Sequence, residues 1–193
     1  GNMFSMAIAS LFIQFLPMMP VQILLNNLLY DLSEMAIPLD RVDEQYVEKP
    51  KKLDILFIRR FMLYFGPVSS VFDLLTFYVL LTFFRAGEQL FQTSWFIESL
   101  CTQTLVVLSI RTEIIPFYKS RPGRLLLLSC LCVPLLSLAL PFTPIGAAFG
   151  FVRPSPLFFP VLLALVFSYL AMVEMMKALF YRHERRLAEP KNI

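Results

Sequence analysis

The chain has 193 residues, of which 58% are hydrophobic and only 16% charged, with a mean hydropathy of +0.68. Soluble domains carry about a quarter charged residues, so this composition excludes an ordinary soluble protein and predicts an all-α integral membrane protein. The 17 Lys and Arg residues, which give a net charge of +3, stand in short clusters between apolar runs. That arrangement is typical of membrane topology and argues against a nucleic-acid partner.

Six apolar runs approach the roughly 20 residues that a helix needs to cross a bilayer. They predict a single transmembrane domain over residues 1–193, built as a bundle of six transmembrane helices. Because the turn at 16–20 (LPMMP) is so short, the first two helices are expected to lie antiparallel and side by side. In chain order the predicted helices cover residues 3–16, 21–38, 57–84, 95–111, 124–141 and 157–181, and a tail follows at 182–193.

The distribution of basic residues predicts the orientation of this bundle. All Lys and Arg residues except Arg85 and Arg153 fall in the clusters 41–60, 111–124 and 177–191. Basic residues in short loops stay on the cytoplasmic side. The second and fourth connections and the C-terminal tail are therefore expected in the cytoplasm.

The second predicted helix carries polar side chains at membrane depth. Asn27 and Asp31 are four residues apart and Glu34 follows three later, so the three share one helical stripe. Buried polar groups in a membrane are costly and usually functional. Asn2 opens the first helix and Gln103 lies in the fourth. Hydrogen bonding between helices, without any ligand, remains the alternative for Asn27 and Asp31.

Other polar residues favour structural interpretations. Asp73 has hydroxyl-bearing neighbours and is expected to be a buried structural acid, whereas Glu98 is expected to be solvated near the external interface. Trp95 is predicted to be an interfacial anchor. Glu174 and Lys177 are three residues apart and are expected to pair near the cytoplasmic end.

The sequence contains no recognisable catalytic or cofactor-binding motif. It has no Gly-rich phosphate loop, no G-x-S-x-G and no H-E-x-x-H. Cys101, Cys130 and Cys132 all fall in apolar runs and are expected to be free, buried thiols, with Cys130 and Cys132 on different faces of a helix. No catalytic residue is predicted, and the only histidine, His183, lies in the basic tail.

Several segments together resemble the C-terminal membrane domain of bacterial magnesium-transporting P-type ATPases. They are residues 26–43 (NNLLYDLSEMAIPLDRVD), 61–73 (FMLYFGPVSSVFD) and 95–107 (WFIESLCTQTLVV), followed by 110–112 (IRT) and 115–117 (IPF). The likeness covers nearly the whole chain. It implies that the six helices are helices five to ten of such a pump, with the fifth entered part-way.

The resemblance also implies a cation site. In that family the ion lies between helices four, five, six and eight. Carried over by position, Asn2, Asn27, Asp31 and Gln103 become candidate magnesium ligands, in a site that is incomplete without helix four. Mg²⁺ prefers oxygen ligands and gives up water reluctantly, so one carboxylate with several amide oxygens suits it.

The phosphorylation motif D-K-T-G-T and the nucleotide-binding domain of the family are not in this sequence. The chain alone is expected to have no ATPase activity, with ATP acting only through those other domains and Mg²⁺ as the transported ion. The implied partners are the lipid bilayer and the remaining N-terminal part of the pump, in the bacterial cytoplasmic (inner) membrane. Two alternatives stay open, a free-standing six-helix structural or regulatory protein and a passive cation channel.

Overall fold

Helices account for the regular structure of the residues that the computed structural model describes, which are 2–40, 55–112, 114 and 116–188, without the side chains of 185–188. Most of the predicted second connection, at 41–54, lies outside them. The helices are α1 (Asn2–Ala9), α2 (Pro20–Glu34), η1 (Ile37–Leu39), α4 (Ile55–Tyr78), η2 (Val79–Phe83), α5 (Glu88–Ile110), η3 (Phe117–Lys119), α6 (Arg124–Ala139), η4 (Leu140–Phe142), α7 (Pro144–Ala148) and α8 (Phe158–Ala188).

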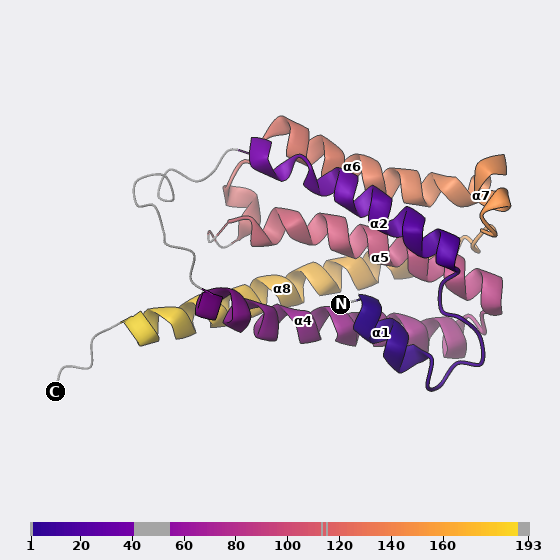
Figure 1. The fold of residues 1–193 in the computed structure, drawn as a ribbon, viewed down its shortest axis with the longest axis horizontal. Helices are drawn as coiled ribbons and strands as arrows, with labels where there is room; N and C mark the ends of the chain where they lie inside the picture. Colours follow the sequence, from indigo (N-terminus) through magenta and orange to yellow (C-terminus); the bar gives the residue numbers. More distant parts are fainter. Residues whose placement is uncertain (1, 41–54, 113, 115, 189–193) are drawn as a thin grey trace.

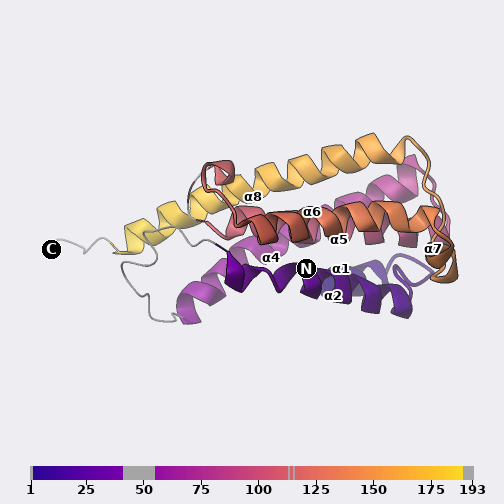
Figure 2. The ribbon, with the colours of Figure 1, turned by 90° about the horizontal axis from the view of Figure 1, so that it is seen from above.

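Four of these helices are long and apolar enough to cross a membrane. They are α4 continued by the π-helical turn η2, then α5, then α6 continued by η4, and α8. All four run along a common long axis in Figures 1 and 2. The chain is therefore a multi-pass membrane protein in its helical part.

The first two predicted helices differ from the observed ones, and a count of six spans is not confirmed. Helix α1 ends at Ala9 instead of near residue 16, and α2 has only 15 residues. At 1.5 Å per residue α2 is about 22 Å long, short of a hydrocarbon core of about 30 Å. The segment 10–19 between them, which ends in the sequence LPMM, is mostly irregular.

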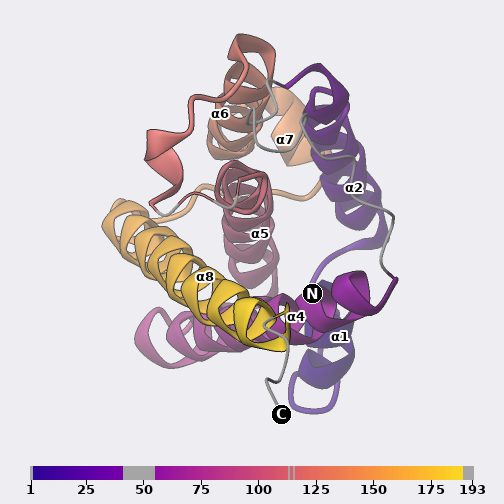
Figure 3. The same ribbon diagram turned by 90° about the vertical axis from the view of Figure 1, so that its left-hand side faces the viewer.

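This irregular segment also separates the two helices. Helix α1 packs mainly on α4, whereas α2 packs on α5 and α6. Figure 3 shows α1 and α2 on different sides of the bundle, so the expectation that they lie side by side is wrong. The physical reason is that ten residues without regular structure can carry the chain from one helix pair to another.

Helix α5 forms the centre of the molecule. It packs against α2, α4, α6 and α8, which surround it in the view along the bundle in Figure 3. Every residue from 91 to 102 is buried. Helix α5 also begins seven residues before the predicted start at 95, because its first two turns carry polar side chains that pack on other parts of the chain.

The basic residues gather at one end of this bundle. Arg59 and Arg60 lie at the start of α4, and Arg111 and Arg124 border the connection between α5 and α6. Figure 1 shows these positions together with the C-terminal half of α8 at one end, while the connections of Arg85 and Arg153 are at the other. The helices thus bring the sequence clusters onto one side.

The three cysteines differ in their burial. Cys101 and Cys130 are buried, and Cys132 is exposed, so the last was wrongly expected to be buried. All three are free. The prediction that Cys130 and Cys132 lie on different faces of a helix is confirmed.

Candidate cation site

Two of the four candidate ligands meet at one hydroxyl group. The Asn2 side chain on α1 donates a hydrogen bond of 2.5 Å to Ser99 Oγ on α5. The amide of Gln103, one helical turn further along α5, donates to the same oxygen. Asn2 and Gln103 are both partly exposed, so their amide oxygens stay available at this junction of α1 and α5.

The other two candidates lie on an open face of α2. Asn27 and Asp31 are both exposed among the described residues. The side of α2 that packs on α5 and α6 carries Gln22, Asn26, Leu29 and Ser33 instead. The structure therefore joins Asn2 to Gln103 through Ser99 but leaves Asn27 and Asp31 exposed, on the face of α2 that points away from α5 and α6.

The open face of α2 is itself divided. At about 100° per residue, the stripe of Asn27 and Asp31 lies about 150° from the centre of the buried stripe. A separate exposed stripe is apolar and contains Leu24, Leu28 and Leu32. An apolar stripe suits lipid, whereas a carboxylate exposed to lipid is strongly disfavoured. The polar stripe of α2 thus calls for a polar or protein neighbour, and only the leucine stripe suits hydrocarbon.

Asn26 is a polar residue of α2 that was not among the predicted ligands. Its side chain is 3% exposed, and its Oδ1 has no hydrogen-bond partner among the described residues. Ser99 was also missed. Its spacing of four residues from Gln103 was the available signal, since residues four apart share a helix face.

The acid Asp73 is buried, as predicted, but its partners come from other helices. The Ser5 hydroxyl on α1 donates to one carboxylate oxygen and the Trp95 indole N–H on α5 donates to the other, at 3.2 Å. Trp95 is completely buried, so its prediction as an interfacial anchor is wrong. The cause is the central position of α5, which buries every residue from 91 to 102.

Glu98 is also misplaced by the sequence argument. Its side chain is 1% exposed, in the interior of the bundle, and is not solvated at the interface. Because α5 begins at Glu88 and not at residue 95, Glu98 lies near the middle of the helix. Asp73 and Glu98 are therefore two acids in the core.

The pair Glu174 and Lys177 is confirmed as an ion pair at 2.8 Å. Lys177 is 1% exposed and its ammonium also donates to the carbonyl oxygens of Ser109, at 2.9 Å, and Ile114, at 3.1 Å. The Ser109 hydroxyl donates to Glu174. These contacts fasten α8 to the C-terminal end of α5, a structural role.

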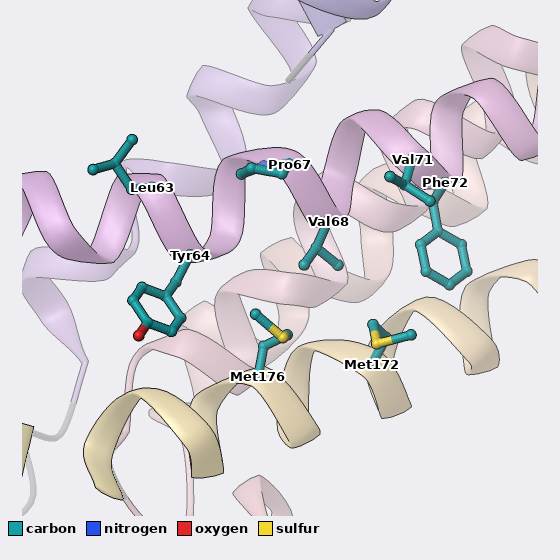
Figure 4. Close-up of a pocket in the computed structure, with 8 residues that line it drawn as sticks. All are labelled: Leu63, Tyr64, Pro67, Val68, Val71, Phe72, Met172 and Met176. Atoms are coloured by element: carbon teal, nitrogen blue, oxygen red, sulfur yellow. The ribbon is translucent and has the colours of Figure 1, made fainter. Parts of the chain in front are cut away.

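A groove between α4 and α8 offers different chemistry from the candidate ligands. Figure 4 shows side chains from both helices lining it, with Tyr64 as the only oxygen-bearing one among those drawn. The lining is otherwise apolar, with Leu63, Val68, Met172 and Met176 among its residues. A hard cation needs oxygen ligands, so this groove does not suit it.

The candidate ligands could hold a hard cation through amide, hydroxyl and carboxylate oxygens. Within the part of the chain described here, no three His, Cys, Asp or Glu residues gather as a metal site. The structure does not bring the four candidates together: Asn2 and Gln103 offer amide oxygens at the junction of α1 and α5, and Asp31 offers a carboxylate on the open face of α2. With so few protein ligands at either place, a bound ion would keep part of its hydration, as Mg²⁺ does in proteins.

Comparison of the sequence with known proteins shows the family of the chain. Residues 15–179 match the family "Cation transporting ATPase, C-terminus". The chain is 41% identical over 187 residues to a protein of Salmonella typhimurium named "Magnesium-transporting ATPase, P-type 1" and 40% identical to one of that name from Escherichia coli K12. The match covers 94% of this chain but 21% of each relative, so the chain spans about a fifth of the length of the curated relatives it matches.

Proposed function

The chain belongs to the family of cation-transporting ATPase C-terminal domains, and we propose that it forms the ion-translocating membrane part of a magnesium-transporting P-type pump. The names of the relatives support magnesium as the transported ion. Phosphorylation and nucleotide binding then belong to other parts of the pump, because their motifs are not in this sequence. The chain by itself has no ATPase activity under this proposal.

The observation that carries this proposal is the polar stripe of α2. Asp31 and Asn27 form an exposed polar stripe next to the stripe of leucines that suits lipid. Helices from the remaining part of the pump, packed on that stripe, would cover the carboxylate and add ligands. Asn2, Asn27, Asp31 and Gln103 would then supply this chain's share of the cation site.

The proposal includes a membrane and an orientation. Helices α1 and α2 are embedded with the four long helices, giving six membrane helices in one domain, in the bacterial inner membrane. The end that carries Arg59, Arg60, Arg111 and Arg124 faces the cytoplasm, together with the C-terminal tail. The gathering of basic residues at this end supports the assignment.

Cysteine labelling tests the orientation. In a Cys132→Ser background, which removes the exposed native thiol, Ser155→Cys should react with a membrane-impermeant reagent added outside intact cells, and Lys119→Cys should not. Both positions are exposed, so access depends only on the side of the membrane. Labelling of Lys119→Cys from outside would overturn the orientation.

Replacement of Asp31 tests the cation site in the intact pump. Asp31→Asn keeps the size of the side chain but removes the negative charge that offsets the lost hydration of Mg²⁺. We expect it to abolish growth rescue of a magnesium-uptake-deficient strain at low Mg²⁺. Asn27→Ala should weaken the apparent affinity by about tenfold, which corresponds to about 1.4 kcal/mol.

Glu88→Gln is the matched control for that experiment. Glu88 is an exposed acid at the start of α5, so its neutralisation should leave rescue intact. Expression and membrane insertion are checked by immunoblot of membrane fractions. Full rescue by Asp31→Asn at normal expression would show that Asp31 does not hold the ion.

A further inference from the structure

Two acids meet in the core of the bundle, apart from the polar stripe of α2. Asp73 on α4 is 3% exposed and Glu98 on α5 is 1% exposed. The Trp95 indole that binds Asp73 lies three residues before Glu98 on α5, about one helical turn away, which places the two acids near one another across the contact between α4 and α5. Like charges held near one another in a medium of low dielectric constant cannot both persist without compensation.

The two acids have unequal hydrogen-bond surroundings. Asp73 accepts one hydrogen bond on each carboxylate oxygen, from Ser5 and from Trp95. Such donors stabilise an ionised carboxylate. Glu98 Oε2 is buried and has no partner among the described residues. The surroundings therefore favour the charge on Asp73.

Two further hydroxyl groups mark this region as a polar site with spare hydrogen-bonding capacity. Thr76 lies three residues after Asp73 on α4, and Ser94 lies four residues before Glu98 on α5, so each shares a helix face with its acid. Both side-chain oxygens are buried and without partners in the described part of the chain. Buried polar groups without partners are uncommon in folded proteins, and each calls for an explanation such as strain, a functional role, or a water or ion.

Among the described residues, no Lys or Arg side chain forms an ion pair with either acid. Three titratable groups interact electrostatically with Glu98, namely Asp73 on α4, Tyr169 on α8 and Cys101 on α5 itself. None of the three can carry a positive charge. The ion pairs formed by described residues use other acids, namely Asp40, Glu174 and Glu184. Helix α1 contributes the Ser5 hydroxyl.

We propose that Asp73 and Glu98 form a proton-binding site that holds one exchangeable proton, with the proton on Glu98 and the charge on Asp73. A shared proton removes the repulsion between the carboxylates and leaves one charge, which Ser5 and Trp95 stabilise. The protonated Glu98 gains an O–H donor that can satisfy a neighbouring hydroxyl oxygen. The pair titrates as a unit.

This proton site adjoins the candidate cation site. Ser5, which donates to Asp73, lies three residues after Asn2 on α1, and Glu98 directly precedes Ser99 on α5. The same two helices therefore carry both sites. The proton site does not depend on which cation the protein moves, so failure of the proposed transport function would leave it standing.

Infrared difference spectroscopy tests the site in the intact protein reconstituted in lipid vesicles at neutral pH. A protonated carboxyl group in the core gives a C=O stretching band that ionised carboxylates lack and that shifts in D₂O. We expect Glu98→Gln to lose this band completely and Asp73→Asn to retain it. Glu88→Gln, which changes an exposed acid on the same helix, should match the parent spectrum.

The unfolding temperatures of the same variants test whether Glu98 is protonated. Gln resembles a neutral Glu in shape, so Glu98→Gln should unfold near the parent temperature. A band that survives in Glu98→Gln overturns the proposal, as does its loss in Asp73→Asn, which would put the proton on Asp73. A marked rise in the unfolding temperature of Glu98→Gln also overturns it, because relief of a buried charge would be its cause. If Glu98→Gln does not fold, Glu98→Asp must shift the band, and an unshifted band overturns the proposal.

Discussion

The end of the bundle where α5 finishes is fastened by ion pairs, whereas the opposite end is fastened by neutral side chains. At the first end Arg111 pairs with Asp40, which also accepts from the backbone N–H of Gly123 at 2.6 Å. Lys177 pairs with Glu174 in the same region. Each of these charges is largely buried and each has an opposite charge beside it.

At the opposite end, amide side chains bind backbone carbonyl groups of the connections. Gln22 on α2 donates to the carbonyl of Phe149 at 3.0 Å. Gln92 on α5 donates to the carbonyl of Leu16 at 2.8 Å. Both glutamines are buried. Here the same task of tying connections to helices is done without charge.

The two ends of the bundle differ in how buried polar and charged side chains are compensated. Buried charges at the basic end are compensated by opposite charges, and the buried side chains that tie the connections at the far end, Gln22 and Gln92, are neutral. Between the ends, the buried acids Asp73 and Glu98 take part in none of the ion pairs formed by the described residues, and the proposed proton would supply the compensation. Removing one partner of a buried pair should therefore cost most at the basic end and least at the neutral end.

The largest effect is expected from Lys177→Met. It would leave Glu174 and two backbone carbonyl groups without their cation, and breaking a buried pair from one side costs about 3–5 kcal/mol. The measurement is thermal unfolding of the purified protein in detergent. The double variant Lys177→Met with Glu174→Gln should recover most of the loss, because no uncompensated charge remains. No recovery would mean that packing of the lysine stem, and not charge, fastens α8.

A smaller effect is expected from Asp40→Asn. The amide oxygen can still accept from Gly123 N–H, but the charge that balances Arg111 is lost, which we expect to cost about 2 kcal/mol. A double-mutant cycle with Arg111→Gln measures the coupling between the two side chains. Additive losses in that cycle would contradict a direct interaction.

The smallest effect is expected from Gln92→Leu at the neutral end. The hydrogen bond from Gln92 to the carbonyl of Leu16 is lost, worth about 1 kcal/mol, together with one to the exposed Glu88 carboxylate, which water can replace. Gln89→Leu is the control, because Gln89 is an exposed residue on the same turn of α5. A loss as large as that of Lys177→Met would remove the contrast between the two ends.

The sequence was most informative where a helix meets lipid directly. The long apolar runs that became α4, α6 and α8 were identified, with starts within two residues of those expected. The stripe of Asn27 and Asp31 could be recognised from helical spacing alone. These features depend on a single helix and its solvent, which periodicity and hydropathy describe.

Features that depend on several helices were missed. Trp95 and Glu98 were assigned to the interface because the helix was predicted to begin at residue 95. Helix α5 instead begins at Glu88, and α2, α4, α6 and α8 pack around it. The break after Ala9 and the pairing of α1 with α4 arise from tertiary packing of a short helix. Spacing within one segment does not reveal which other segment will cover it.

The burial of α5 has a consequence for biogenesis. Of the four long helices it has the lowest mean hydropathy and the largest buried share, because its polar side chains face protein and not lipid. A nascent segment of this kind partitions weakly into hydrocarbon by itself. Stable integration of α5 therefore requires other helices that cover its polar side chains. Helix α4 is synthesised before α5 and α6 directly after it, so these two helices are the first that can pack on α5 at the translocon. Substitutions that weaken its contacts with α6 would then reduce the yield of inserted protein even where the finished fold tolerates them.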